Sequence, residues 1–266
     1  MVSPSESRPP YLSSYGDEDA WSPRLKREEF VPAKREYSLF TKCLAEFLGD
    51  LTFVFVGVMQ AAAGGDGITH AALAHGFTIF ILVTAFGHIS GGHFNPAVSW
   101  AIAGAGKMPA IHLPFYVGAQ LLGGTCGAFL AAAILSNAQL YVIGAGATLL
   151  SDGTQWWQGL ISETVVTFFL VHTILISAAD SDSVTLAPLA IGLTLSIDIF
   201  ATGAITGASM NPARSLGPNI VASALLPSSL QVWNYHYIYW AGPLLGSTIA
   251  LCVYKLFEAR EDRIVS

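Results

Sequence analysis

The middle of this 266-residue chain contains almost no charge. Asp, Glu, Lys and Arg make up 11% of the residues, whereas about 25% is usual for a soluble domain. Of the 12 Lys and Arg residues, only Lys107 and Arg214 lie between Cys43 and Tyr254. A protein surface built from this segment carries too little charge for contact with water. Because the segment has no basic patch, we expect no nucleic-acid partner.

Cysteines and groups of metal ligands are also scarce. The three cysteines lie inside apolar stretches and lack the spacing of a metal site or a disulfide framework. His75 and His93 fall in the same half of the chain, but no nearby carboxylate or thiolate completes a metal site with them. A nucleophile, a base and an orienting group do not occur together either. We therefore expect no metal, no cofactor and no enzymatic reaction.

The chain does contain six apolar runs with the length of a helix that crosses the ~30 Å hydrocarbon core of a bilayer. They are residues 38–62, 68–88, 111–135, 157–178, 186–203 and 235–257. Basic residues precede the first run and follow the last, so the positive-inside rule places both termini in the cytoplasm. The sequence thus predicts a multi-pass membrane protein with a flexible cytoplasmic tail at 1–36, a membrane domain at 37–257 and a cytoplasmic C-terminal tail at 258–266.

A tripeptide occurs twice in the chain. Asn95-Pro96-Ala97 returns as Asn211-Pro212-Ala213, 116 positions later (211 − 95). Because Pro favours the first helical position and Asn caps a helix, each copy predicts the start of a short half-helix. Matches at this offset extend over two repeats of three spans, about 37–135 and 157–257, so the second repeat is inverted. The predicted fold is an all-α membrane protein with six transmembrane helices and two re-entrant half-helices.

Two half-helices whose N-termini meet create a polar point near the middle of the membrane. Their dipoles are positive there, and Asn95 and Asn211 add amide N–H donors. The loops that lead to them, which include His93, should present carbonyl groups to a water-filled path. We expect apolar residues of three helices to line the opposite wall: Ile79, Leu195 and Val98. A neutral hydrogen-bonding molecule can pass such a lining, whereas a cation is repelled.

Two carboxylates stand at matching places in the repeats. Glu46 lies 49 positions before Asn95, and Glu163 lies 48 positions before Asn211. Unpaired backbone donors inside a membrane cost several kcal/mol, so we expect both carboxylates to brace the loops by accepting from them. A proton-relay role is the alternative, and it requires proton conductance to disappear in Glu46→Gln and Glu163→Gln.

The flanks of the two tripeptides carry a family resemblance. Residues 90–98 (SGGHFNPAV) and 206–214 (TGASMNPAR), set in a repeat of six spans, resemble the major intrinsic proteins, the aquaporins, over about residues 38–257. This resemblance implies a passive channel for water that excludes protons and ions. It also implies a homotetramer in the lipid bilayer, with a pore in each subunit.

The resemblance further implies a selectivity filter made of His75, Ile199, Ala208 and Arg214. In strict water channels of the family, Phe stands at the place of His75, His at that of Ile199, Cys or Thr at that of Ala208, and Arg at that of Arg214. A wider filter with His and Ile is similar to the ammonia-permeable branch, which includes plant vacuolar and vertebrate type-eight aquaporins, and the latter are the most similar. Ala208 departs from the Gly more usual in that branch. Ser215 replaces an Asp of glycerol-conducting members, which argues against glycerol.

Several alternatives remain at this level. His75 is either a filter residue or a core histidine, and protonation at low pH would add a second positive charge that closes the pore. A secondary transporter shares inverted repeats and broken helices but needs midplane acids for ion coupling. A membrane enzyme and a structural role for a closed pore are the other rivals. The host membrane is the plasma membrane or an internal one such as a vacuole, and Asp50 and Asp198 have no predicted role.

Overall fold

The computed structural model describes residues 36–180, 184–227 and 231–264. The chain divides into Met1–Glu36 and Tyr37–Ser266, and the following description concerns the second unit. The predicted tail at 1–36 lies outside the described residues, apart from Glu36.

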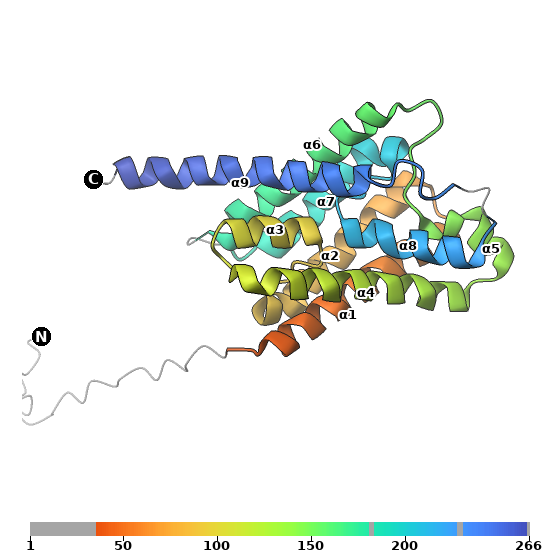
Figure 1. Cartoon of the computed structure of the whole chain (residues 1–266), viewed down its shortest axis with the longest axis horizontal. Coiled ribbons are helices and arrows are strands. Elements are labelled where there is room, and N and C mark those ends of the chain that lie inside the picture. Colours follow the sequence, from red (N-terminus) through yellow and green to blue (C-terminus); the bar gives the residue numbers. More distant parts are fainter. Residues whose placement is uncertain (1–35, 181–183, 228–230, 265–266) are drawn as a thin grey trace, which may run out of the picture. The chain divides into compact units, whose positions relative to one another are not determined.

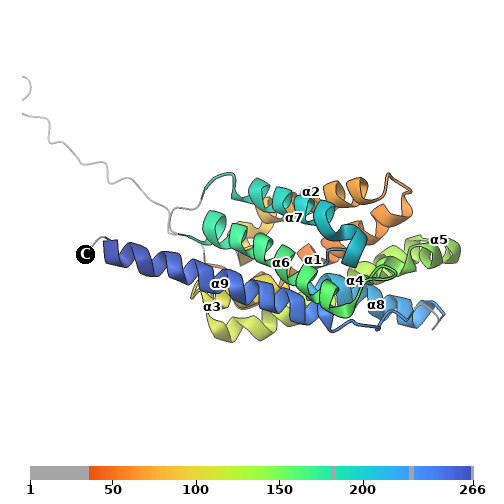
Figure 2. The same cartoon turned by 90° about the horizontal axis from the view of Figure 1, so that it is seen from above.

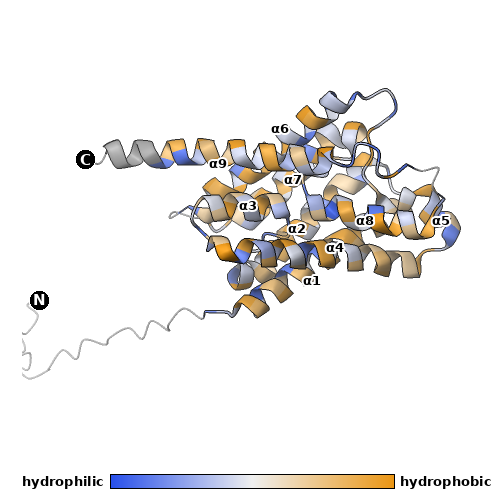
Figure 3. Cartoon of the chain, in the orientation of Figure 1, coloured by the Kyte–Doolittle hydropathy of each residue, from blue (hydrophilic) through white to orange (hydrophobic). Residues whose placement is uncertain are grey.

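Six helices in the described residues are long and apolar enough to cross a membrane. They are α1 (Leu39–Ala62), α2 (Ile68–Ser90), α4 (Leu113–Ile134), α6 (Trp156–Ile174), α7 (Ala187–Thr206) and α9 (Ile238–Ile264). Figure 3 shows apolar residues on all six helices, with α9 coloured up to residue 258. The six predicted spans are confirmed, and α9 continues as a helix beyond the predicted end of its span at residue 257.

Two short helices complete the bundle: α3 (Pro96–Gly104) and α8 (Pro212–Leu225). Each begins at the proline of its tripeptide, and the preceding Asn is the cap. The Asn95 side chain accepts from the Ala97 N–H at 2.8 Å, and Asn211 accepts from the Ala213 N–H at 2.8 Å. The two helices lie in line with their N-termini facing each other inside the bundle (Figures 1 and 2). The predicted pair of half-helices is therefore present.

The connection between α4 and α6 is more ordered than the sequence analysis predicts. It contains α5 (Asn137–Val142), which a capping box of Ser136 and Gln139 starts, and the 3-10 turn η4 (Gly144–Gly146). Two further short segments extend longer helices: η3 (Ala110–His112) before α4 and the π-helical turn η5 (Leu175–Ala179) after α6. The η4 turn matters for function because the carbonyl group of Gly146 contacts the site described below.

Helices α2 and α7 cross at a pair of glycines 116 positions apart. A Cβ atom added to Gly76 would lie 2.6 Å from the carbonyl oxygen of Gly192, and one added to Gly192 would lie 2.5 Å from that of Gly76. The Ser196 hydroxyl also donates to the Ala72 carbonyl at 3.0 Å. This reciprocal contact shows the pseudo-twofold relation between the repeats, because each glycine makes room for the other helix.

Small residues also serve the other helix crossings within this chain. Gly123 and Gly127 of α4 lie against the backbone carbonyls of Phe47 and Leu51 in α1, and Gly246 of α9 lies against the Thr164 carbonyl in α6. The four-residue spacing of glycines thus allows close packing inside the subunit.

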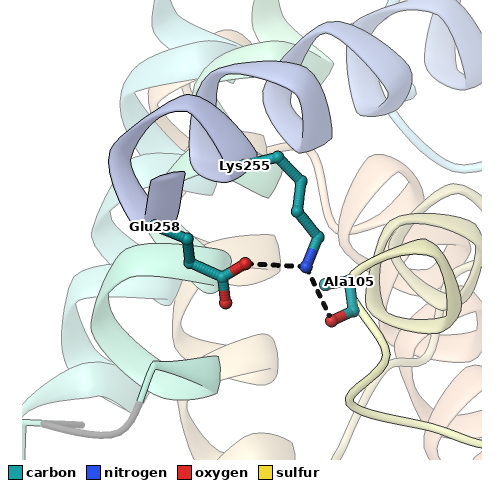
Figure 4. Close-up of polar contacts among 3 residues, drawn as sticks. All are labelled: Ala105, Lys255 and Glu258. Carbon is teal, nitrogen blue, oxygen red and sulfur yellow. Dashed lines mark hydrogen bonds and ion pairs between the residues drawn. The ribbon is translucent and has the colours of Figure 1, made fainter. Parts of the chain in front are cut away.

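The C-terminal part of α9 holds the end of α3. The Lys255 ammonium donates to the Ala105 carbonyl at 3.3 Å and pairs with Glu258 at 2.7 Å (Figure 4). Ala105 is the C-cap of α3, where the helix dipole is negative, so a cation there is favourable. In the neighbouring loop, the Lys107 ammonium lies 5.9 Å from the centroid of the Tyr254 ring, and its interaction with this tyrosine raises the pKa of Lys107.

Candidate functional site

The first pore loop is bonded to a buried carboxylate of α1. Glu46 Oε1 accepts from the Ser90 hydroxyl at 2.6 Å and from the His93 N–H at 3.0 Å, and Oε2 accepts from the Phe94 N–H at 2.6 Å. The Gln120 amide of α4 donates to the same Oε2 at 2.8 Å. Every one of these donors is thereby satisfied without water.

The second loop repeats this pattern with Glu163 of α6. Glu163 Oε1 accepts from the Thr206 hydroxyl at 2.6 Å and from the Ser209 N–H at 2.9 Å, and Oε2 accepts from the Met210 N–H at 2.8 Å. These donors follow those of the first loop by 116 positions, so the sequence offset is also an offset in hydrogen bonding. Two carboxylates thus hold the two non-helical segments through the same set of hydrogen bonds.

The two asparagines bind each other's loops. The Asn95 amide donates to the Met210 carbonyl at 2.7 Å, and the Asn211 amide donates to the Phe94 carbonyl at 2.7 Å. Phe94 and Met210 have φ of 46° and 53°, a left-handed conformation that side chains other than Gly rarely adopt. This backbone aims each carbonyl at the opposite amide, and the cross-bracing compensates its strain. The result is a rigid polar junction between α3 and α8.

Arg214 follows the junction on α8. Its guanidinium donates to the Gly146 carbonyl of η4 at 3.1 Å, and its side chain is partly exposed. None of the described residues forms a salt bridge with it. A cation held by a neutral carbonyl keeps its positive field, which opposes other cations nearby.

His75 of α2 packs against α1. Its Nδ1 lies 2.7 Å from the Ala71 carbonyl, which only accepts, so the neutral ring carries its proton on Nδ1. The Phe53 ring meets it edge-on with centroids 5.3 Å apart. The side chain is 4% exposed, and no described residue contacts Nε2 with a hydrogen bond.

The apolar residues expected along the wall fall into two groups. Ile79, Leu195, Ile199 and Ala208 are buried in one apolar cluster. Val98 belongs to a separate cluster around α3 and α9, so the structure does not place it with the other four. The side chain of His93 is buried as well, 8% exposed.

That histidine takes part in a buried network of the first loop. His93 Nδ1 lies 3.0 Å from the Ser99 hydroxyl, and its ring centroid lies 5.2 Å from that of Tyr116. The matching positions of the second repeat are Ser209 and Ser215, whose hydroxyls are 2.5 Å apart. Each pore loop thus makes a side-chain hydrogen bond to a serine of the half-helix that follows it, Ser99 or Ser215, from a histidine in the first repeat and a serine in the second.

Three residues of this arrangement were not predicted. Tyr116 donates its hydroxyl proton to the Ser90 carbonyl at 2.8 Å, and Tyr239 does so to the Thr206 carbonyl at 2.8 Å. Gln120 links the Glu46 carboxylate to the Ser99 hydroxyl at 2.8 Å. Gln120 is a polar residue inside an apolar run, and that signal alone marks it in the sequence.

Gly57→Ala tests how strongly α1 positions His75. A Cβ atom at residue 57 would lie 2.7 Å from His75 Nε2, so the ring must leave its rotamer at a cost of about 0.5–1.5 kcal/mol. We expect water permeability in proteoliposomes to change several-fold. Gly118→Ala is the matched control, because its Cβ meets no atom within 4 Å. Equal permeability of the two variants would show that the His75 ring position is unimportant for flux.

Comparison with known proteins agrees with this geometry. The sequence model of the major intrinsic protein family matches residues 33–254. Aquaporin TIP4-4 of Zea mays is 39% identical over 234 residues, which are 82% of this chain and 86% of that protein. Aquaporin-8 of Rattus norvegicus is 36% identical over 223 residues, 82% of each chain.

A solved structure gives the same fold. The aquaglyceroporin from Plasmodium falciparum aligns with a TM-score of 0.72 over 82% of this chain and 96% of that chain, at 23% identity. At this identity the match supports the fold alone. The family match and the relatives go further: the chain belongs to the major intrinsic proteins, the aquaporins, and is an integral membrane channel for water and small solutes, not an enzyme.

Proposed function

We propose that this channel conducts water and ammonia passively and excludes protons and ions. The proposed filter consists of His75, Ile199, Ala208 and Arg214. The observation that supports it is the guanidinium of Arg214, which donates to the Gly146 carbonyl of η4 at 3.1 Å and has no described carboxylate in a salt bridge with it. A fixed positive charge near small and aliphatic neighbours admits neutral molecules and repels cations.

Ammonia as a second permeant follows from the residue types in the filter. Ile199 offers no hydrogen bond, and His75 replaces a bulkier aromatic ring, so the opening is wider and less tuned to water. With Ile199 and His75 in its filter, we assign the chain to the ammonia-permeable branch. The chain is 39% identical to a TIP-type relative and 36% identical to a type-eight relative. These values are too similar to assign the chain to one subgroup, so the proposal of ammonia permeability rests on the filter residues.

Ion exclusion has a second support at the junction. The N-termini of α3 and α8 face each other there, and Asn95 and Asn211 direct amides to the same region. Helix N-termini carry partial positive charge, so a cation entering between them is repelled. The roles of Glu46 and Glu163 in this proposal are to hold the loops, not to carry protons.

Assembly and orientation complete the proposal. We propose a homotetramer because the chain is an aquaporin; large apolar side chains on α2 and α7, such as Ile81 and Ile197, are about 60% exposed and need contact with lipid or with another subunit. Both termini face the cytoplasm, since the basic residues gather at the two ends of the chain. The host membrane is the plasma membrane or an internal membrane such as a vacuole.

Stopped-flow shrinkage of proteoliposomes tests the proposed function. Vesicles with the full chain should lose water faster than empty vesicles under an osmotic gradient, and should take up ammonia, but not glycerol, faster. Saturation or counterflow would instead indicate a transporter. Water flux equal to that of empty vesicles would refute the central claim.

His75→Phe tests the filter assignment. The larger ring narrows the opening and removes the Nε2 acceptor, so ammonia permeability should fall roughly 2- to 10-fold more than water permeability, the equivalent of one hydrogen bond. The two fluxes are measured on the same vesicle preparation. An equal loss of both permeants would argue against His75 as a residue that selects between them.

A further inference from the structure

A line of hydrogen bonds runs from the first bracing carboxylate to the ring of His93. Glu46 Oε2 accepts from the amide nitrogen of Gln120 at 2.8 Å, and the same nitrogen donates to the Ser99 hydroxyl at 2.8 Å. The Ser99 oxygen in turn lies 3.0 Å from His93 Nδ1. Glu46, Gln120 and Ser99 are each 0% exposed, so these contacts are shielded from solvent. We call these four residues the Gln120 network.

The direction of each hydrogen bond in the Gln120 network is fixed from the carboxylate end. Glu46 accepts at both oxygens from backbone N–H groups of the loop, so Gln120 must turn its NH2 group, and not its oxygen, toward Glu46. The second N–H of this amide donates to Ser99. The Ser99 oxygen therefore accepts from Gln120, and its own proton goes to His93 Nδ1, the other partner found for it among the described residues. Since Nδ1 accepts, the neutral ring carries its proton on Nε2.

The Nε2 atom of His93 is accessible. It has no partner among the described residues, yet it is not among the fully buried polar atoms, whereas Nε2 of His75 is. A Cβ atom added to Gly91 would lie 2.8 Å from His93 Nε2, so the two residues are neighbours. Gly91 is exposed, so solvent reaches the region beside Nε2. The His93 N–H is thus a donor that a small molecule can contact.

Bracing of the loop does not by itself require Gln120. It follows Tyr116 by four positions, and Pro243 follows the matching tyrosine of the second repeat, Tyr239, by four positions. Proline has no polar side chain and no backbone N–H to donate. Glu163 nevertheless holds the second loop with the same three loop donors. Gln120 is therefore an addition to the first repeat, the one in which the loop carries a histidine ring.

We propose that Gln120 is a positioning residue that acts through Ser99 to keep the proton of His93 on Nε2, where the N–H donates to the lone pair of a small neutral permeant. This inference rests on the proposed function. With the proton on Nδ1, the Ser99 oxygen would face two N–H donors, and its own proton would have no acceptor among the described residues. A fixed N–H donor attracts the lone pair of water or ammonia and repels a cation.

Solid-state 15N NMR of the full-length protein in lipid vesicles tests the Gln120 network, because protonated and unprotonated ring nitrogens differ in chemical shift. The signals of His93 are those lost in His93→Gln, and in the wild type they should show the proton on Nε2. In Gln120→Leu, Ser99 is able to accept or donate, so the ratio of the Nε2–H to the Nδ1–H tautomer should fall about 3- to 10-fold, as expected for one hydrogen bond. Ser99→Ala should lower the ratio likewise, whereas Ser99→Thr keeps the hydroxyl and should retain the wild-type ratio.

Ser247→Ala is the matched control. The Ser247 hydroxyl is also 0% exposed and donates to the Ala97 carbonyl of the same half-helix at 2.7 Å, but it lies outside the Gln120 network. Its removal should leave the tautomer ratio unchanged. In stopped-flow shrinkage, water permeability of Gln120→Leu should fall with the Nε2–H fraction, about 2-fold where half of the rings have lost it. Ser247→Ala should conduct as the wild type does.

The two measurements separate this inference from the proposed function. An unchanged tautomer ratio in both Gln120→Leu and Ser99→Ala would overturn the positioning role, and so would an equal fall in Ser247→Ala. A lower ratio in Gln120→Leu with unchanged water permeability would overturn the role of the N–H as a donor to permeants. A wild type that passes no water would refute the proposed function together with that donor role, and the NMR result would still decide whether Gln120 sets the tautomer.

Discussion

Glu163→Leu should reduce water permeability to the level of empty vesicles. The substitution leaves the Thr206 hydroxyl and the N–H groups of Ser209 and Met210 without their acceptor. Each unsatisfied buried donor costs about 1–3 kcal/mol, so the second loop cannot keep the strained backbone that aims the Met210 carbonyl at Asn95. Stopped-flow shrinkage measures the loss, and thermal unfolding in detergent should show a lower midpoint.

Glu163→Gln separates bracing from charge. The amide oxygen can still accept from Thr206 and Ser209, while its NH2 group opposes the Met210 N–H, so an intermediate water permeability is expected. Proton leak should not fall below that of the wild type. Full water flux in Glu163→Leu would contradict the bracing role, and a proton leak present in the wild type but lost in Glu163→Gln would favour a relay instead.

Gly76→Leu should prevent the bundle from assembling. Even the first carbon of the new side chain would lie 2.6 Å from the Gly192 carbonyl and closer still to the Ser196 hydroxyl, so α2 and α7 must separate. Overpacking of a core typically costs about 1–3 kcal/mol, and a rigid backbone carbonyl places this site at the upper end. The fraction of monodisperse protein in detergent and its unfolding midpoint measure the effect.

Two controls locate the cause of that loss. Gly118→Ala, with no atom within 4 Å of its Cβ, should behave as the wild type does. Adding Ser196→Ala to Gly76→Ala should restore only part of the stability, because it removes the hydroxyl but leaves the Gly192 carbonyl. Complete rescue by Ser196→Ala would mean that the backbone contact between the two helices is not limiting.

The parts of this protein that depend on sequence pattern were predictable. Apolar runs set the six spans, since a helix in lipid must satisfy its own backbone. The Asn-Pro pairs set the starts of α3 and α8, since the cap and the first helical position have strict local requirements. The exact ends of α9 and the presence of the short helix α5 were not predicted, because hydropathy alone determines neither of them.

Side-chain partners across the repeats needed the structure. Pattern and spacing predicted that Glu46 and Glu163 accept from the loops, but not that Gln120 joins the first carboxylate. Val98 packs in the cluster around α3 and α9, and Ile79 and Leu195 pack in the other cluster, because the neighbours of a helix residue are not set by its own sequence. His75 has the spacing of a filter residue, while its contact with α1 depends on Gly57, 18 positions earlier (75 − 57).

The sequence by itself determined the membrane solvent, the inverted repeat and the two half-helices, because these follow from length, hydropathy and local backbone preference. Tertiary structure alone decided how the halves lock together. The exchange of hydrogen bonds between Asn95 and Met210, and between Asn211 and Phe94, joins residues 115 and 117 positions apart. The place of Asp50 beside that exchange also depends on how α1 packs against α8, and no local pattern records a contact across 161 positions.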